Sequence, residues 1–148
     1  LAGVDKTKYD IAKDSLRVVT LSLATLGGGS ALNEYLANNG DPRFYPLVYV
    51  ALGESLLEKR RYTDGAQAYA AFIERYAGSP RAPAFQSRVI GAYGEGGFRD
   101  QVAIGGAQLA VGTKVGGEHG IGRAVELHHR EQHLFDLVEL LQVNFHVY

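Results

Sequence analysis

Residues 52–85, LGESLLEKRRYTDGAQAYAAFIERYAGSPRAPAF, contain two helical patterns with a short polar turn between them. The turn comprises residues 60–64, which are charged or polar apart from Tyr62. Apolar residues recur after it at spacings of three and four, which predicts a helix with one apolar face. The residues that share this face are Ala66, Tyr69, Ala70, Ile73 and Tyr76. The stretch therefore predicts a pair of helices joined by a tight turn.

Helical patterns also precede this pair. A helix is expected from Asp5 to Leu26, because apolar residues recur there at helical spacing before three glycines end the pattern. A shorter helix is expected over residues 31–37, with Ser30 as its N-cap. The first helix of the quoted pair is predicted to begin after Pro42 or Pro46, since proline is accepted in a first helical turn.

Another helix is expected after the pair. Ser79 is placed to cap it and Pro80 to occupy its first position, and its apolar stripe is Phe85, Val89 and Ala92. Residues 94–97 are predicted to end this helix, because three of these four residues are glycine.

The pattern weakens over residues 105–122, which hold seven glycines. Glycine is a poor helix former, so a loop, a frayed helix and a small hairpin around residues 111–115 all remain open. Helical patterning returns over residues 123–148. We therefore divide the chain into helix pairs (1–104), a glycine-rich connection (105–122) and a terminal helix of the same array (123–148).

Composition excludes several classes of protein. The 148 residues include no cysteine, which excludes disulfide scaffolds, thiolate metal sites and cysteine nucleophiles. The chain has 15 basic and 16 acidic residues, and this balance predicts no broad surface that binds nucleic acid or anionic membranes. The apolar run at residues 18–26 is shorter than the roughly 20 residues of a membrane span. The sequence starts at Leu1 and shows no signal-peptide pattern, and we interpret it as a processed or partial chain.

An internal repeat links the two halves of the helical region. Tyr62 and Phe98 each follow a helical pattern and begin another, and they are 36 residues apart. Asp64 and Asp100 have the same spacing. Helix-pair repeats of about 34 residues form the tetratricopeptide class, because two short antiparallel helices and two turns need that length.

Several residues carry a resemblance to the tetratricopeptide repeat family. They are Leu52-Gly53 in the first helix, Tyr62 in the turn, Gly65 and Tyr69 in the second helix, and Phe72, Ile73 and Tyr76 before Ser79-Pro80. In the family these positions are structural, and the two glycines let paired helices approach closely. The final group resembles a variant found in bacterial envelope members, such as the outer-membrane assembly lipoprotein and the periplasmic partner of the Tol-Pal system. Ala77 departs from that variant, which has proline there.

The resemblance implies an all-α, right-handed superhelical array of antiparallel helix pairs, an α-solenoid. It implies a non-catalytic scaffold without a cofactor that binds a peptide or protein in a concave groove, in the periplasm or at the outer membrane. A homo-oligomer or a larger assembly remains open. The residues that we expect to contact a partner are Tyr49, Glu54, Lys59, Arg61, Gln67 and Arg88.

A metal-binding helical bundle or metalloenzyme is the alternative from another class. Glu126, His129, His133 and Asp136 fall on one stripe of the predicted terminal helix, at spacings of three and four. Glu-x-x-His, here Glu126 and His129, is half of a di-iron motif, and the sequence contains no second copy. A solvent-exposed polar helix face explains the same spacing, and we favour that interpretation.

Overall fold

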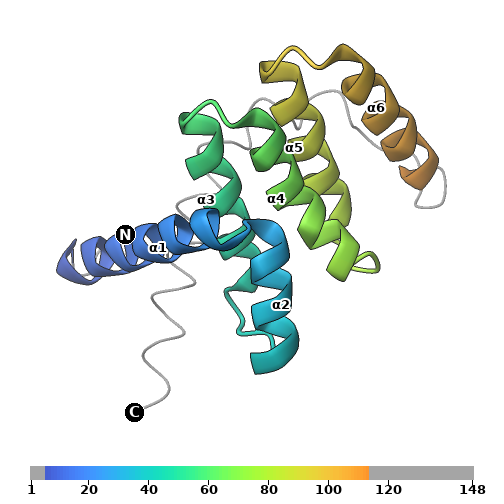
Figure 1. The fold of residues 1–148 in the computed structure, drawn as a ribbon. Helices are drawn as coiled ribbons and strands as arrows, with labels where there is room; N and C mark the ends of the chain where they lie inside the picture. The colour runs from blue at the N-terminus through green and yellow to red at the C-terminus, as the bar shows by residue number, and fades with distance from the viewer. Residues whose placement is uncertain (1–5, 114–148) are drawn as a thin grey trace. The chain divides into compact units, whose positions relative to one another are not determined.

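A computed structural model of the protein describes residues 6–113, and no strand occurs in this range. The prediction of an all-α fold is thereby confirmed for this part of the chain (Figure 1). Residues 19–113 belong to one compact unit, whereas residues 6–18 of the first helix lie outside it. The helices are α1 (Lys6–Leu26), α2 (Gly29–Asn39), α3 (Tyr45–Glu58), α4 (Tyr62–Arg75), α5 (Ala82–Glu95) and α6 (Arg99–Thr113).

Proline and glycine signals locate most helix ends correctly. α1 ends at Leu26, and Gly27 follows with a φ of 127°, a value that favours glycine. α3 begins at Tyr45 and carries Pro46 in its first turn. α5 ends at Glu95, within the predicted glycine-rich break.

Both predicted N-caps are wrong. Gly28, rather than Ser30, is the N-cap of α2, which starts at Gly29. Gly29 lies so close to α4 that a Cβ there would be 2.6 Å from the Ala71 Cβ. Arg81 is the N-cap of α5, so Ser79 precedes the helix. Ser79 Oγ instead accepts a hydrogen bond from the Arg81 backbone N–H at 3.2 Å and stabilises the turn before α5.

α6 continues through part of the glycine-rich segment. The predicted boundary between residues 104 and 105 falls inside this helix, which ends at Thr113. Gly105 is buried, and a Cβ added there would lie 2.8 Å from a side-chain carbon of Ile90 in α5. This part of α6 is thus helical and packs closely against α5, although glycine has a poor intrinsic propensity for helix.

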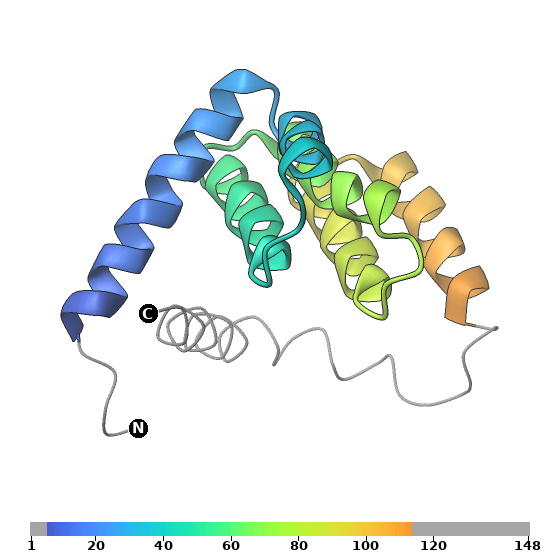
Figure 2. The same ribbon diagram turned by 90° about the horizontal axis from the view of Figure 1, so that it is seen from below.

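Helices α3 to α6 lie side by side in chain order, and neighbours run in opposite directions (Figures 1 and 2). α2 packs mainly on α4 and also contacts α3. Each connection from α3 onward is short, which favours antiparallel neighbours. The described unit is therefore a row of helical hairpins in which each helix packs on the next.

The turns α3–α4 and α5–α6 are equivalent. Arg61 and Phe98 both accept the first main-chain bond of the next helix, from Gly65 at 2.9 Å and Val102 at 3.1 Å. These two residues are 37 positions apart. The predicted pairing of Tyr62 with Phe98 is therefore one residue out of register, because it matched aromatic side chains whereas backbone bonds define the turn.

Two glycines bring α3 and α4 close together, as the sequence predicted. The Tyr69 ring of α4 covers Gly53 of α3 so closely that any Cβ there would overlap it. A Cβ on Gly65 would lie 3.2 Å from the Gly53 carbonyl oxygen and 2.8 Å from Leu57. The backbones of α3 and α4 therefore approach closely where both helices have glycine.

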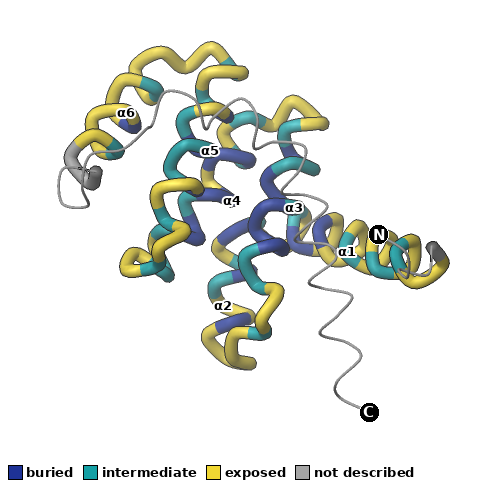
Figure 3. The backbone as a smooth tube through the Cα atoms, turned by 180° about the vertical axis from the view of Figure 1, so that it is seen from behind, coloured by how far each residue is buried: buried dark blue, intermediate teal, exposed yellow. Residues whose placement is uncertain are grey.

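The core lies where α3, α4 and α5 meet (Figure 3). Phe72 of α4 and Phe85 of α5 stack with their ring centroids 3.7 Å apart. Tyr49 of α3 meets Phe72 edge-on at 5.5 Å. Aromatic pairs of this kind add roughly 0.5–1.5 kcal/mol beyond the area that they bury. The largest fully buried side chains are Tyr49, Tyr69, Phe72, Leu52 and Leu56.

Candidate functional site

The structure brings together two of the predicted partner-contact residues, Glu54 of α3 and Arg88 of α5. Arg88 Nη1 donates to Glu54 Oε1 at 3.2 Å. The Arg88 guanidinium also lies over the Tyr69 ring of α4, 5.7 Å from its centroid. Burial, with the negative charge of Glu54 nearby, raises the pKa of Tyr69. This cluster therefore ties three helices together, and its two charged side chains remain 29% and 16% exposed.

The remaining predicted partner-contact residues differ in exposure. Tyr49 is fully buried, and its hydroxyl donates a hydrogen bond to Asn33 Oδ1 of α2. Burial raises the pKa of this hydroxyl. Lys59, Arg61 and Gln67 are exposed. Tyr49 thus holds α2 against α3, whereas the other three side chains are accessible from solvent.

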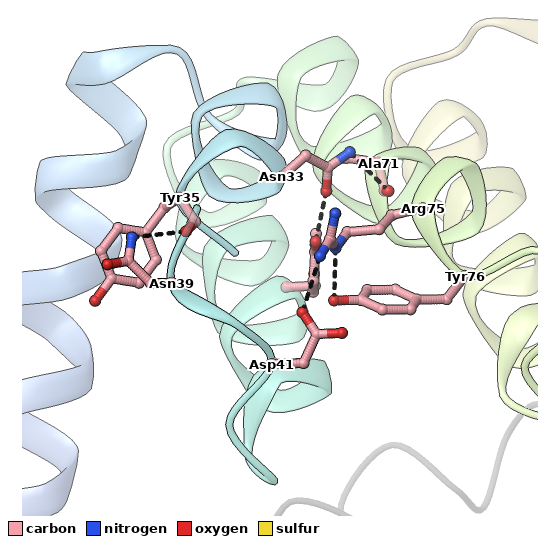
Figure 4. A network of polar contacts seen from close by, with 8 residues as sticks. Asn33, Tyr35, Asn39, Asp41, Ala71, Arg75 and Tyr76 are labelled. Carbon is pink, nitrogen blue, oxygen red and sulfur yellow. Dashed lines mark hydrogen bonds and ion pairs between the residues drawn. The ribbon is translucent and has the colours of Figure 1, made fainter. Parts of the chain in front are cut away.

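Sequence reasoning missed a polar network at the C-terminal end of α4, where Arg75 and Tyr76 lie (Figure 4). Arg75 Nε donates to Tyr76 Oη at 2.8 Å, and Arg75 Nη2 donates to Asp41 Oδ1 at 3.1 Å. Hydrogen bonding with Tyr76 and Arg75 lowers the pKa of Asp41. Asp41 and Arg75 are 34 residues apart with no motif between them, so only tertiary packing could reveal this link.

Asn33 carries a second part of the same network (Figure 4). Its Nδ2 donates to the Ala71 carbonyl oxygen at 3.1 Å, while its Oδ1 accepts from Tyr49. One side chain of α2 therefore binds both α3 and α4. Together with the link between Asp41 and Arg75, it fixes α2 and the following loop on the hairpin.

The turn after α3, residues 59–61, holds three basic residues in a defined backbone geometry. The Arg61 N–H bonds to the Leu56 carbonyl at 2.9 Å, and the Arg60 N–H bonds to the Leu57 carbonyl at 2.8 Å. This bond pair is a Schellman motif, whose left-handed position is usually glycine. Arg60 occupies it here with a φ of 58°. A side chain in this conformation costs about 1–2 kcal/mol.

The equivalent turn after α5 has glycine at this position. The Phe98 N–H bonds to the Tyr93 carbonyl at 2.9 Å, and the Gly97 N–H bonds to the Gly94 carbonyl at 3.1 Å. Gly97 has a φ of 78°. The two turns therefore share one bond pattern, and only the turn with Arg60 carries the cost of a left-handed side chain.

Several large apolar side chains of the described unit remain exposed on α1, α2 and α6. Leu26 at the end of α1 is 75% exposed, Tyr35 of α2 is 58% exposed and Ile104 of α6 is 53% exposed. Of these three, Tyr35 is of a type that is enriched in surfaces that contact other proteins. Their positions at both edges of the row make the edges, as well as the hairpin faces, candidate contact surfaces.

The predicted metal residues Glu126, His129, His133 and Asp136 lie outside the described residues. Within residues 6–113, no three His, Asp or Glu side chains are grouped so that they could hold a metal ion. In the same range, no helix has both the length and the hydropathy that crossing a bilayer requires.

Comparisons with known proteins return no match. No protein-family model, no curated protein and no solved structure is similar to this chain.

Proposed function

We propose that the protein is a non-catalytic scaffold, a tetratricopeptide-like α-solenoid that binds a peptide or protein segment on its row of helices. The observation that carries this proposal is the repetition of one hairpin. Two turns with the same bond pattern lie 37 residues apart, and the helices that they join pack in chain order. Arrays of this kind expose a continuous surface formed by corresponding helices, which suits extended partners.

The cluster of Glu54 and Arg88 is the contact that we favour on the hairpin faces. Its charged atoms are partly exposed and are held by Tyr69, so the side chains are ordered before a partner arrives. Ordering in advance lowers the entropy cost of binding. Gln67 of α4 is also exposed, but it stands two positions from Tyr69 along the helix and so lies on a different side of α4 from this cluster.

The proposal includes a bacterial envelope setting, at the periplasm or the outer membrane. Its ground is the resemblance of residues 72–80 to envelope members of the tetratricopeptide family. The balanced charge of the whole chain favours a protein partner over a nucleic acid.

A crosslinking experiment followed by titration tests the proposed function. A photoreactive residue at Glu58, which is exposed and lies one helical turn from Glu54 on α3, would capture the partner in the cells of origin. The purified partner would then be titrated calorimetrically. We expect the Glu54→Gln and Arg88→Gln variants each to weaken binding by about five-fold or more, because each loses a charge-assisted hydrogen bond. The paired control, Glu74→Gln with Arg81→Gln, removes exposed charges of both signs elsewhere and should not change affinity.

Two results would overturn the scaffold proposal. The first is a purified partner that binds the wild type and the Glu54 and Arg88 variants equally. The second is stoichiometric metal in the purified protein that is lost in the His129→Ala variant, which would favour the metal-binding alternative.

A further inference from the structure

We infer that the turn of Lys59 and Arg60 is a docking point for an acidic segment of a partner protein. The inference rests on the proposed scaffold function and names the chemistry of its partner. It starts from the comparison of two equivalent turns in one chain. Gly97 takes the left-handed position in the second turn, whereas Arg60 takes it in the first.

The bonds of the turn do not require an arginine at this position. The α5–α6 turn makes the same two main-chain bonds with glycine, so the backbone alone closes this turn. Arg60 is the only residue other than glycine with a positive φ among residues 6–113. Its side chain is exposed and makes no hydrogen bond or ion pair with the described residues that would offset this cost. A contact beyond residues 6–113 would explain why a strained arginine stands where glycine fits, and we infer that a partner protein supplies it.

The charges of this turn point to an acidic partner. Arg61 is already neutralised, since its Nε lies 2.7 Å from Asp64 Oδ2. Lys59 and Arg60 are exposed, and no ion pair joins either of them to a carboxylate of the described residues. Glu58 is the nearest other acidic residue along the chain and pairs with neither. Within residues 6–113, two adjacent cations thus lack a carboxylate partner, and a guanidinium can bind a carboxylate of a partner protein through two parallel hydrogen bonds.

The partner class that fits is a flexible segment rich in aspartate or glutamate. A turn offers a small convex contact, which one or two carboxylate side chains can reach without a matching pocket. Exposed ion pairs of this kind contribute modestly and weaken with salt, so the docking point would add to contacts elsewhere on the array.

A direct test measures the fluorescence anisotropy of a labelled hexaglutamate peptide with the whole chain at low salt. We expect Arg60→Gly to weaken binding by about five-fold and Lys59→Ala with Arg60→Gly to weaken it further. Arg60→Lys should lose less affinity than Arg60→Gly, because it keeps the charge but not the paired hydrogen bonds of the guanidinium. Arg60→Asn, which tolerates the left-handed conformation without charge, should behave like Arg60→Gly. Arg81→Ala is the matched control, because it removes an exposed cation from another turn.

Folding does not confound this test, since Arg60→Gly is expected to raise the unfolding midpoint. Equal losses in Arg60→Gly and Arg81→Ala would overturn the inference, because they would show only an effect of net charge. Tighter binding of a twelve-residue oligothymidylate than of hexaglutamate would overturn it in favour of a nucleic acid. Wild-type protein that does not bind hexaglutamate would also refute it, while leaving the scaffold proposal to the separate partner titration.

Discussion

Replacing Gly53 by alanine tests the packing that holds α3 against α4. The Tyr69 ring lies directly over Gly53, and a Cβ there would be 2.9 Å from Cδ1 and closer still to the two neighbouring ring atoms. Such distances require the ring to move. Tyr69 is 2% exposed and is held between α3, Phe85 and Arg88, so little space is available for that movement.

The expected magnitude follows from two opposing effects. Overpacking a well-filled core costs about 1–3 kcal/mol, and the buried ring places Gly53→Ala at the upper end of this range. Replacing a helical glycine by alanine stabilises the helix by about 1 kcal/mol. The free energy of unfolding should therefore fall by about 2 kcal/mol, after both effects are counted.

Gly91 of α5 provides the matched control for this change. Among the described residues, no atom outside the adjoining backbone of α5 lies within 4 Å of a Cβ added there, so Gly91→Ala should raise the free energy of unfolding by up to about 1 kcal/mol. Urea unfolding followed by circular dichroism at 222 nm measures both variants against the wild type, provided that the slope with denaturant is unchanged. A Gly53→Ala protein as stable as Gly91→Ala would refute the close approach of Tyr69.

Three further predictions concern the core and the titrating groups. Phe72→Ala should lower the free energy of unfolding by about 3–5 kcal/mol in urea titrations, because the Phe72 side chain is fully buried. Phe44→Ala, at a side chain that is 40% exposed, should cost much less. Burial raises the pKa of the Tyr49 and Tyr69 hydroxyls, so the unfolded chain loses these protons first and stability should fall as the pH rises above 10. Thermal melts at pH 9 and pH 11 would check this, and a fall that is equally steep in Tyr49→Phe would contradict the assignment to Tyr49. The lowered pKa of Asp41 means that its contribution to stability is present above pH 3.8 and is lost as the pH falls through its pKa in the folded protein. Asp41→Asn should therefore lose less stability than the wild type between pH 4 and pH 2, and parallel acid titrations of both proteins would decide the point.

Local signals in the sequence located most of the helices. Apolar spacing, Pro46 and the glycines after Leu26 depend on neighbours within one or two turns of the chain, and such signals can be read without tertiary structure. The close approach at Gly53 and Gly65 was also predicted, through the family resemblance. The register of the repeat was not, because backbone bonds at Arg61 and Phe98 define it.

The candidate site was predictable only in part. Glu54 and Arg88 were named as contact residues, yet nothing in their spacing indicated that they would pair with each other across α3 and α5. The strain at Arg60 was hidden for a different reason. A basic run in a turn gives no sign of which residue takes the left-handed conformation, and only the hydrogen bonds of the turn assign it.

The position of α6 at the edge of the row has a consequence for hydrogen exchange. Gly105 is its only buried residue among those whose side chains are described, whereas α3 has seven buried residues and α4 has six. Amide protons of α6 should therefore exchange through local opening, at a free energy well below that of global unfolding. The hairpin of α3 and α4 would exchange last, and a partner that binds along α5 and α6 would slow exchange at this edge most.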